Sequence, residues 1–267
     1  MNAMQEKLVD MLKWYHEFCK QHGLRYYAVG GTCLGAVRHH GFIPWDDDID
    51  VGMPREDYNR FFDLMQTEKD GRYCLETPFE NKDFVYPYGK LYDTATTLTE
   101  NTRFKTKRGL YIDVFPLDGA GNSMEESRAL FKRVDDKRNL LCTQVCALSK
   151  HRKFYKNAAI VLLRYMPGLS WKQTMKKVIE YSSARSFYKD EYVANYAGAW
   201  HFKEITKRAY FGEPKEMDFE HIKIYCPENT DAYLRGLYGD YMQLPPKEKQ
   251  VSHHDYLFLD LETGYKE

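Results

Sequence analysis

The sequence lacks an excess of charge of either sign, because lysine and arginine together number 39 and aspartate and glutamate also number 39. A chain without net charge has no overall field that would draw it to nucleic acid or to an anionic membrane. We therefore expect no nucleic-acid partner and at most peripheral contact with a membrane.

Long hydrophobic runs are also missing. No stretch approaches the roughly 18 uninterrupted apolar residues of a transmembrane helix, and the N-terminal residues lack the pattern of a signal peptide. We expect a cytoplasmic protein, and the alternative is a protein that associates with the inner face of the membrane. The most apolar run, residues 158–169, is too short to span a bilayer. It would lie at a membrane interface or, as the preferred alternative, pack inside the protein.

Cysteine is sparse, and the six residues form no tight framework. Cys142 and Cys146 lie four residues apart in a helical pattern, but no second pair of His or Cys follows at the spacing of a zinc site. Free thiols are the expectation, with Cys142 and Cys146 packed in the core.

The chain contains a mixture of helical and strand patterns. Apolar residues recur at helical spacing in residues 4–21, 55–66 and 229–238. Strand-like patterns occupy residues 24–29, 73–76, 88–92, 97–98 and 110–114. The order of these elements predicts an α+β fold, in which a mixed β-sheet carries flanking helices.

The same patterns divide the chain into three segments. Residues 1–121 are expected to form the core that carries the chemistry, and residues 122–200 a charged helical appendage. Residues 201–267 are expected to pack back on the core.

The strongest chemical signal is Trp45-Asp46-Asp47-Asp48-Ile49-Asp50-Val51. If this run is a strand, Asp48 and Asp50 share one face while Ile49 and Val51 enter the core. Two such carboxylates repel each other unless a cation lies between them, and Mg²⁺ is bound by one or two carboxylates together with substrate phosphates. An acidic surface turn is the alternative, but it would not need alternating apolar residues.

Two further motifs fit the same site. Ile112-Asp113-Val114-Phe115 places a third acid on a buried strand, so that Asp48, Asp50 and Asp113 could hold one or two metal ions. Gly30-Gly31-Thr32 joins a strand to a helix, with Thr32 as the expected N-cap. Such a helix start can bind a phosphate closely.

The segments GGTCLGAVRHHGFIPWDDDIDVGMPREDY, GLYIDVFPLDG and YLRGLYGDYMQLPPKEKQVSHH resemble the LicD family of phosphocholine transferases, which is related to the fukutin proteins. The resemblance implies a nucleotidyltransferase fold and transfer of phosphocholine, or a related alcohol phosphate, from CDP-choline or a similar CDP-alcohol. The implied acceptor is a hydroxyl of a glycan precursor of teichoic acid or lipopolysaccharide, in some members lipid-linked, and CMP leaves. Residues 122–200, where the similarity is weakest, are then expected to take part in acceptor recognition. The expected cofactor is Mg²⁺, as one ion or two, with Mn²⁺ able to substitute.

Several other residues are candidates for the site. Arg38 and Lys90 could bind the donor phosphates, and Asp46 and His39 lie close to the motifs in the sequence. His253 and His254 match the terminal motif of the family. For these residues an ordinary surface role is the competing interpretation.

Two rival functions remain open at this point. The same acids would serve a nucleotidyltransferase that moves a nucleotide monophosphate from an NTP to a small acceptor and releases pyrophosphate. A binding module without catalytic activity is the other rival, although it would have no physical reason to keep three acids in this arrangement.

Overall fold

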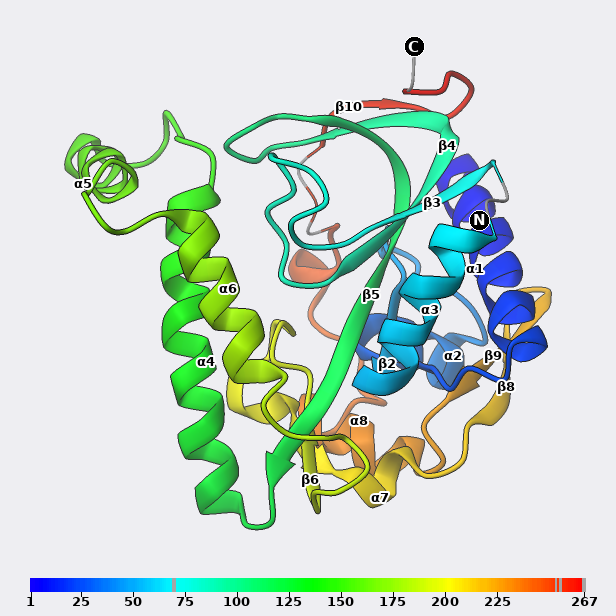
Figure 1. Cartoon of the computed structure of the whole chain (residues 1–267). Coiled ribbons are helices and arrows are strands. Elements are labelled where there is room, and N and C mark those ends of the chain that lie inside the picture. Colours follow the sequence, from blue (N-terminus) through cyan, green and yellow to red (C-terminus); the bar gives the residue numbers. More distant parts are fainter. Residues whose placement is uncertain (69–70, 253, 255, 266–267) are drawn as a thin grey trace.

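The computed structural model describes residues 1–68, 71–252, 254 and 256–265. Its centre is a mixed sheet in the order β1-β2-β5-β4-β10, with β3 paired to β4 and the short strands β6 and β7 joined through β5 (Figure 1). The strands are β1 Tyr27–Ala28, β2 Asp50–Pro54, β3 Tyr73–Glu76, β4 Gly89–Glu100, β5 Lys107–Gly121, β6 Tyr192–Ala194, β7 Ile205–Lys207 and β10 Tyr256–Asp260. β2 and β5 run parallel, whereas β4 lies antiparallel to β5.

Helices cover this sheet, which confirms the predicted α+β class of a mixed sheet with flanking helices. The first group is α1 Ala3–Gln21, α2 Gly30–His39 and α3 Arg55–Thr67. The second group is α4 Met124–Val145, α5 Phe154–Arg164 and α6 Trp171–Ser182. The remaining helices are η1 His201–Glu204, α7 Arg208–Phe211, α8 Thr230–Tyr238 and η2 Lys247–Lys249.

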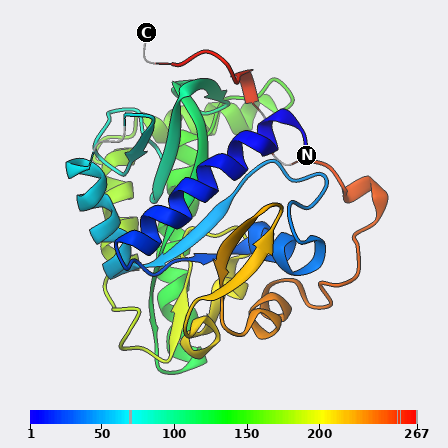
Figure 2. The same ribbon diagram turned by 90° about the vertical axis from the view of Figure 1, so that its right-hand side faces the viewer.

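The first helix shows how local sequence sets an element. The side chain of Asn2 caps α1 by accepting a hydrogen bond from the backbone N–H of Gln5. The side chain of Gln5 in turn accepts a hydrogen bond from the backbone N–H of Asn2. Leu8, Leu12 and Tyr15 follow at helical spacing and are fully buried against the sheet. Figure 2 shows α1 lying across the molecule beside the hairpin of β8 Lys215–Phe219 and β9 Ile222–Cys226.

Two local predictions were wrong. The strand expected over residues 24–29 is reduced to β1, and helix α2 starts at Gly30 with Val29 as its N-cap, so Thr32 is not the cap. Thr32 Oγ1 instead accepts a hydrogen bond from the backbone N–H of Asp50 at 2.9 Å. The side chain therefore ties the start of α2 to β2 rather than satisfying its own helix.

Residues 122–200, predicted to be a helical appendage, contain the three long helices α4, α5 and α6. They also contain the short strand β6. α4 and α6 pack on each other around a separate apolar cluster that includes Phe131, Val134, Met175 and Val178. β6 pairs antiparallel with the end of β5, so this segment also extends the sheet.

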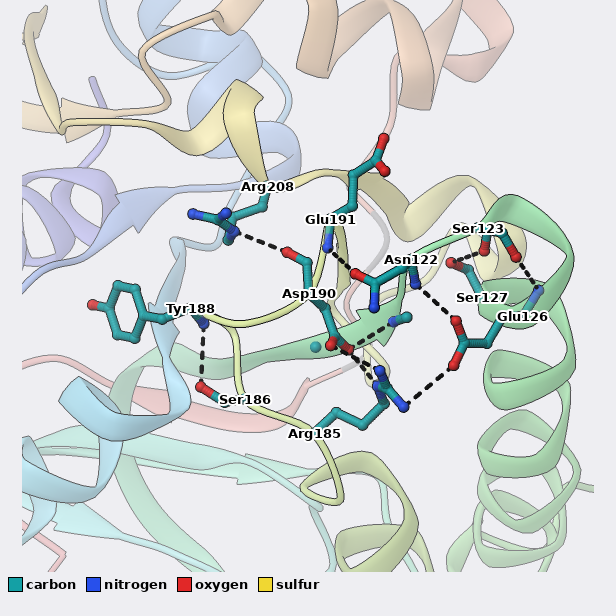
Figure 3. A network of polar contacts seen from close by, with 12 residues as sticks. Asn122, Ser123, Glu126, Ser127, Arg185, Ser186, Tyr188, Asp190, Glu191 and Arg208 are labelled. Atoms are coloured by element: carbon teal, nitrogen blue, oxygen red, sulfur yellow. Dashed lines mark hydrogen bonds and ion pairs between the residues drawn. The ribbon is translucent and has the colours of Figure 1, made fainter.

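A polar network fixes the junction of β5, α4 and β6 (Figure 3). Asp190 accepts from the backbone N–H of Gly121 at 2.7 Å and from Arg185 Nη2 at 2.9 Å. Arg185 Nη1 also lies 3.2 Å from Glu126 Oε1 on the first turn of α4. Because Glu126 Oε2 accepts from the Asn122 N–H at 2.8 Å, the turn out of β5 has a fixed direction.

Within the residues that the structure describes, no helix combines the length and the apolar character needed to cross a bilayer.

Candidate active site

Strand register brings the candidate acids together. Asp50 on β2 is the Cα partner of Asp113 on β5, and Asp113 is in turn the partner of Lys90 on β4. Asp48 precedes β2, so the prediction that Asp48 and Asp50 both lie in a strand was wrong. The burial still alternates as expected, since Ile49 and Val51 are fully buried while both acids are partly exposed.

These acids open into a cavity of about 220 Å³, which we call the reaction cavity. One wall holds Asp48, Asp50 and Asp113, beside the start of α2 at Gly30 and Gly31. The other residues that line it are Val29, Tyr88, Phe115, Asn195, Ala197, Gly198, Ala199, Trp200, Glu204 and Tyr238. The reaction cavity thus joins the N-terminal motifs to residues 195–204 and to the end of α8.

Lys90 is an internal cation of this site. Its side chain is 1% exposed, and Nζ lies 2.9 Å from Asp113 Oδ1 and 3.3 Å from Glu100 Oε1. The rings of Tyr111 and Tyr86 enclose it, with centroids 3.3 and 4.2 Å from Nζ. Lys90 therefore contacts Asp113 directly, and it lies too deep to present its ammonium to solvent.

The buried carboxyls have raised pKa values. Burial, followed by the charge of Asp48, raises the pKa of Asp46 to about 8. Burial and the neighbouring Asp48 and Asp113 raise the pKa of Asp50 well above its usual range. Burial also raises the pKa of Asp113 to about 6, and the charge of Lys90 opposes the rise. This wall is therefore electrostatically unfavourable until a cation joins it.

The glycine pair lets the helix start approach the acids. Gly30 has φ +52°, a conformation that other residues rarely adopt, and a Cβ on Gly31 would come within 2.7 Å of Asp46 Oδ2. The N–H of Gly30 is donated to Tyr233 Oη at 3.1 Å. Thus Gly30 shapes the wall, and its own N–H is already used.

His254 approaches the acids from the C-terminal part of the chain. Its Nδ1 lies 2.8 Å from Asp47 Oδ1 and its Nε2 lies 3.5 Å from Asp48 Oδ2. Burial alone would lower its pKa, but the hydrogen bond to Asp47 and the charge of Asp48 raise the pKa of His254 to about 8. His253, the other histidine of this motif, lies outside the described residues.

Arg38 and His39 lie at the far end of α2. Arg38 donates to the carbonyl of Tyr241 at 2.6 Å and to His39 Nε2 at 2.9 Å. Eight residues of helix separate Arg38 from Gly30, which is about 12 Å of axial rise. Neither side chain lines the reaction cavity.

The residues present fit a hard divalent cation. Asp113 Oδ1 is buried and accepts no hydrogen bond within the described part of the chain, although Lys90 lies beside it. The oxygen donors of Asp48, Asp50 and Asp113 are the type that Mg²⁺ prefers. Among the described residues, the group of three whose ligand atoms lie within 4.8 Å of one another is Asp47, Asp48 and His254, and not Asp48, Asp50 and Asp113. An imidazole ligand suits Zn²⁺ or Fe²⁺ better than Mg²⁺.

A larger cavity of about 620 Å³ adjoins the reaction cavity, and we call it the outer cavity. Both cavities share Tyr88, Ala197 and Ala199. Arg138, Asn139 and Arg152 supply polar groups to its wall. Cys142 is exposed and Cys146 partly exposed, and both line this cavity, so the prediction that they pack in the core was wrong.

Sequence reasoning missed the far wall of the reaction cavity. Trp200, Glu204 and Tyr238 carry no local motif and come from segments at least 150 residues after Asp50 and at least 87 after Asp113. Tyr88 had a usable signal, because it lies two residues from Lys90 and therefore on the same side of the chain near the start of β4.

Comparison with known proteins places this geometry in context. The nucleotidyltransferase domain described as LicD/FKTN/FKRP matches residues 23–138. The chain is 31% identical over 260 residues to the lipopolysaccharide cholinephosphotransferase LicD of Haemophilus influenzae, covering 95% of this chain and 96% of that protein. Over 46 residues it is 54% identical to the ribitol 5-phosphate transferases FKRP of Homo sapiens and Mus musculus, which is 17% of this chain and 9% of each of those proteins.

Proposed function

The chain belongs to the LicD/FKTN/FKRP nucleotidyltransferase family, as the sequence motifs predicted, and from this premise we propose that it transfers an alcohol phosphate to a glycan hydroxyl. The transferred group is phosphocholine and the donor is CDP-choline, by analogy with the cholinephosphotransferase that matches nearly the whole chain. The observation that carries this proposal is the register of β2, β5 and β4, which places Asp50 and Asp113 side by side in the wall of the reaction cavity, with Lys90 behind Asp113.

Asp48 and Asp50 would hold Mg²⁺ in the reaction cavity, and Asp113 would complete the ligand set. When bound, the ion neutralises the donor diphosphate and favours in-line displacement at phosphorus. The acceptor oxygen forms a bond to the phosphorus that carries choline, the bond from that phosphorus to the bridging oxygen breaks, and CMP leaves. Asp113, with a pKa of about 6, takes the proton of the acceptor hydroxyl.

Lys90 acts on Asp113 rather than on the donor. Its position 2.9 Å from Oδ1 keeps the carboxylate oriented and favours its ionised form. The rings of Tyr86 and Tyr111 and the carboxylate of Glu100 hold the ammonium in place. Lys90 is therefore a positioning residue in this proposal.

The acceptor would occupy the outer cavity. It meets the reaction cavity at Tyr88, Ala197 and Ala199, so a hydroxyl bound there could reach the phosphorus without leaving the protein. Arg138, Asn139 and Arg152 offer donors for the hydroxyl and phosphate oxygens of a glycan precursor. This arrangement supports the prediction that residues 122–200 help to choose the acceptor.

A lipid-linked acceptor would also explain α5. Residues 137–179 contain no Asp or Glu, and α5 lies at the end of the α4–α6 pair away from the sheet (Figure 1). Within residues 158–169, Leu162 and Tyr165 are 69 and 76% exposed, so the preferred alternative of burial was wrong for this run apart from Ile160, which is buried. Phe154, just before the run, is 87% exposed. We propose that α5 and its flanks lie on an anionic membrane surface, where basic residues and exposed aromatics both contribute.

The test is an incubation with Mg²⁺, a lipopolysaccharide oligosaccharide or teichoic acid acceptor, and a panel of CDP-choline, CDP-ethanolamine and CDP-ribitol. Release of CMP that depends on the acceptor supports the proposal. Release of pyrophosphate from an NTP, with no CMP from any CDP-alcohol, would replace it with nucleotidyl transfer.

A further inference from the structure

The far wall of the reaction cavity combines two perpendicular aromatic rings with a buried carboxylate. Trp200 and Tyr238 have ring centroids 4.9 Å apart and planes at 79°. Glu204 lies in the same wall and is 8% exposed. Its Oε1 accepts the backbone N–H of Trp200 at 3.2 Å, which holds the indole and the carboxylate in one short segment.

Glu204 has no ion-pair partner within the described part of the chain. Burial raises the pKa of Glu204 to about 7, and the positive charge of Arg138 opposes the rise. The guanidinium of Arg138, however, is already paired with Asp135 at 2.6 Å and donates a hydrogen bond to the carbonyl of Gly198. A carboxylate that lines a cavity beside aromatic faces, without a cation of its own, is complementary to a cationic ligand.

The tyrosine cage around Lys90 cannot serve the same purpose, because Lys90 fills it. Nζ lies over Tyr111 and Tyr86 and forms ion pairs with Glu100 and Asp113. This set of aromatic and acidic side chains is therefore already occupied by the ammonium of Lys90. Trp200, Tyr238 and Glu204 form a second set of the same composition that borders the cavity.

We infer that Trp200, Tyr238 and Glu204 form the subsite for a quaternary ammonium group on the donor alcohol. The inference rests on the proposed function, because it assigns one end of the donor that the carboxylates would process. A quaternary ammonium has no N–H to donate, so aromatic faces and a nearby negative charge are its natural partners. A neutral polyol has several hydroxyls and would gain little from two ring faces.

The subsite sets substrate choice within the reaction cavity. The acids on the opposite wall would bind any CDP-alcohol through its diphosphate and metal. The rings and Glu204 would favour choline over ribitol by a cation–aromatic contact, which corresponds to about two- to thirtyfold in affinity. The same residues should matter little for CDP, which has no alcohol group.

The experiment measures binding of CDP-choline, CDP-ribitol and CDP by calorimetry with Mg²⁺, for the wild type, Glu204→Gln and Trp200→Leu. Glu204→Gln keeps an acceptor oxygen for the backbone N–H of Trp200, so this substitution removes the negative charge with little change in side-chain shape. Trp171→Leu is the matched control, because Trp171 packs against Phe104 with the ring planes tilted by 53° and lines neither cavity. Thermal midpoints confirm that each variant is folded.

We expect both cavity variants to lose about two- to thirtyfold in affinity for CDP-choline, with CDP affinity and the Trp171→Leu control unchanged. An equal loss for CDP and CDP-choline would show a merely structural role for these residues and overturn the subsite. Wild-type preference for CDP-ribitol would also overturn it, while leaving transfer from a CDP-alcohol intact. Binding of CDP-choline that depends on Glu204, together with no release of CMP from any donor in the transfer assay, would retain the subsite and reject the proposed function.

Discussion

Asp113 and Asp118 are both buried carboxylates on β5, but their surroundings differ. Asp118 forms a two-point ion pair with Arg55, with distances of 2.8 and 2.6 Å, and does not line the reaction cavity. Asp113 lines the cavity and has Lys90 beside one oxygen. The sequence distinguished the two acids by their apolar neighbours, whereas the structure distinguishes them by their partners.

This difference predicts separable phenotypes at the residue scale. Asp50→Asn should lower turnover by at least about a hundredfold. Loss of a metal ligand should cost no less activity than loss of a residue that only hydrogen-bonds to a metal ligand. Its thermal midpoint should hold or rise, since a repulsive buried charge is removed. Asp113→Asn should lose turnover similarly with some loss of stability, because Lys90 loses one of its two ion-pair partners in the described part of the chain.

Asp118→Asn provides the contrast. Breaking its buried pair with Arg55 should lower the free energy of unfolding by about 3–5 kcal/mol, while turnover of the protein that remains folded at low temperature stays near normal. Denaturant unfolding and CMP release, measured on the same samples, separate the two effects. Near-normal turnover of Asp50→Asn at saturating Mg²⁺ would sink the metal-site assignment.

Glu204 gives a pH-dependent prediction. Its pKa of about 7 in the folded protein exceeds its ordinary value of 4.5, so the folded state holds the proton more tightly. Its contribution to stability is therefore present below pH 4.5 and is lost as the pH rises through about 7. Between pH 5 and pH 8, the wild type should lose up to about 3 kcal/mol relative to Glu204→Gln.

Urea unfolding of both proteins at several pH values, without ligand or metal, measures this difference. Asp46, Asp50 and Asp113 titrate in both proteins, so their effects cancel in the comparison. A constant difference across this range would mean that Glu204 is already ionised at low pH.

At the scale of elements, α5 differs from the other long helices because it packs little of its surface. Of its described residues, Ile160 is the one that is buried. Lys150, Arg152, Lys153 and Lys156 lie before or within its first turns. The whole-chain balance of charge concealed this region, because 39 acidic residues elsewhere offset it. The net charge of the whole chain therefore says little about how this region would interact with a membrane.

Flotation with anionic liposomes tests the membrane proposal. The wild type should float at low salt and be released at high salt, because exposed charges are screened. Leu162→Glu should weaken flotation, whereas Leu244→Glu, at an exposed leucine in the loop after α8, should leave it unchanged. If neither the wild type nor the control floats at low salt, α5 does not act as a membrane surface.

At the scale of the whole molecule, the diphosphate at the centre of the donor should contribute more to binding affinity than the groups at its two ends. The acids and helix start on one wall favour a metal-bound diphosphate, so CDP should bind far more tightly than cytidine, and only with Mg²⁺. CMP should fall between them, and choline should add the smaller increment described above. Calorimetry with CDP-choline, CDP, CMP and cytidine, each with and without Mg²⁺, checks the ranking; tight metal-independent binding of CDP would contradict it.

The sequence predicted the near wall of the site better than the far wall for a physical reason. Asp48, Asp50 and Asp113 lie in segments where alternation with apolar residues limits which way a side chain points. Arg38 is close to Gly30 in sequence, but the helix carries it to the opposite end of α2. Trp200 and Tyr238 meet only through the path of the chain after β6, which no local pattern encodes.

β5 gives the molecule an internal reporter of hydrogen exchange. The strand has neighbours on both sides, and the amide of Asp113 is bonded to the carbonyl of Ile49 at 3.0 Å. That amide should exchange only when the whole protein opens, whereas amides in α5 should exchange through local opening. Its deuterium uptake therefore measures global opening at the acidic wall of the reaction cavity. An inactive variant with unchanged protection there has lost chemistry, and one with lost protection has lost the fold.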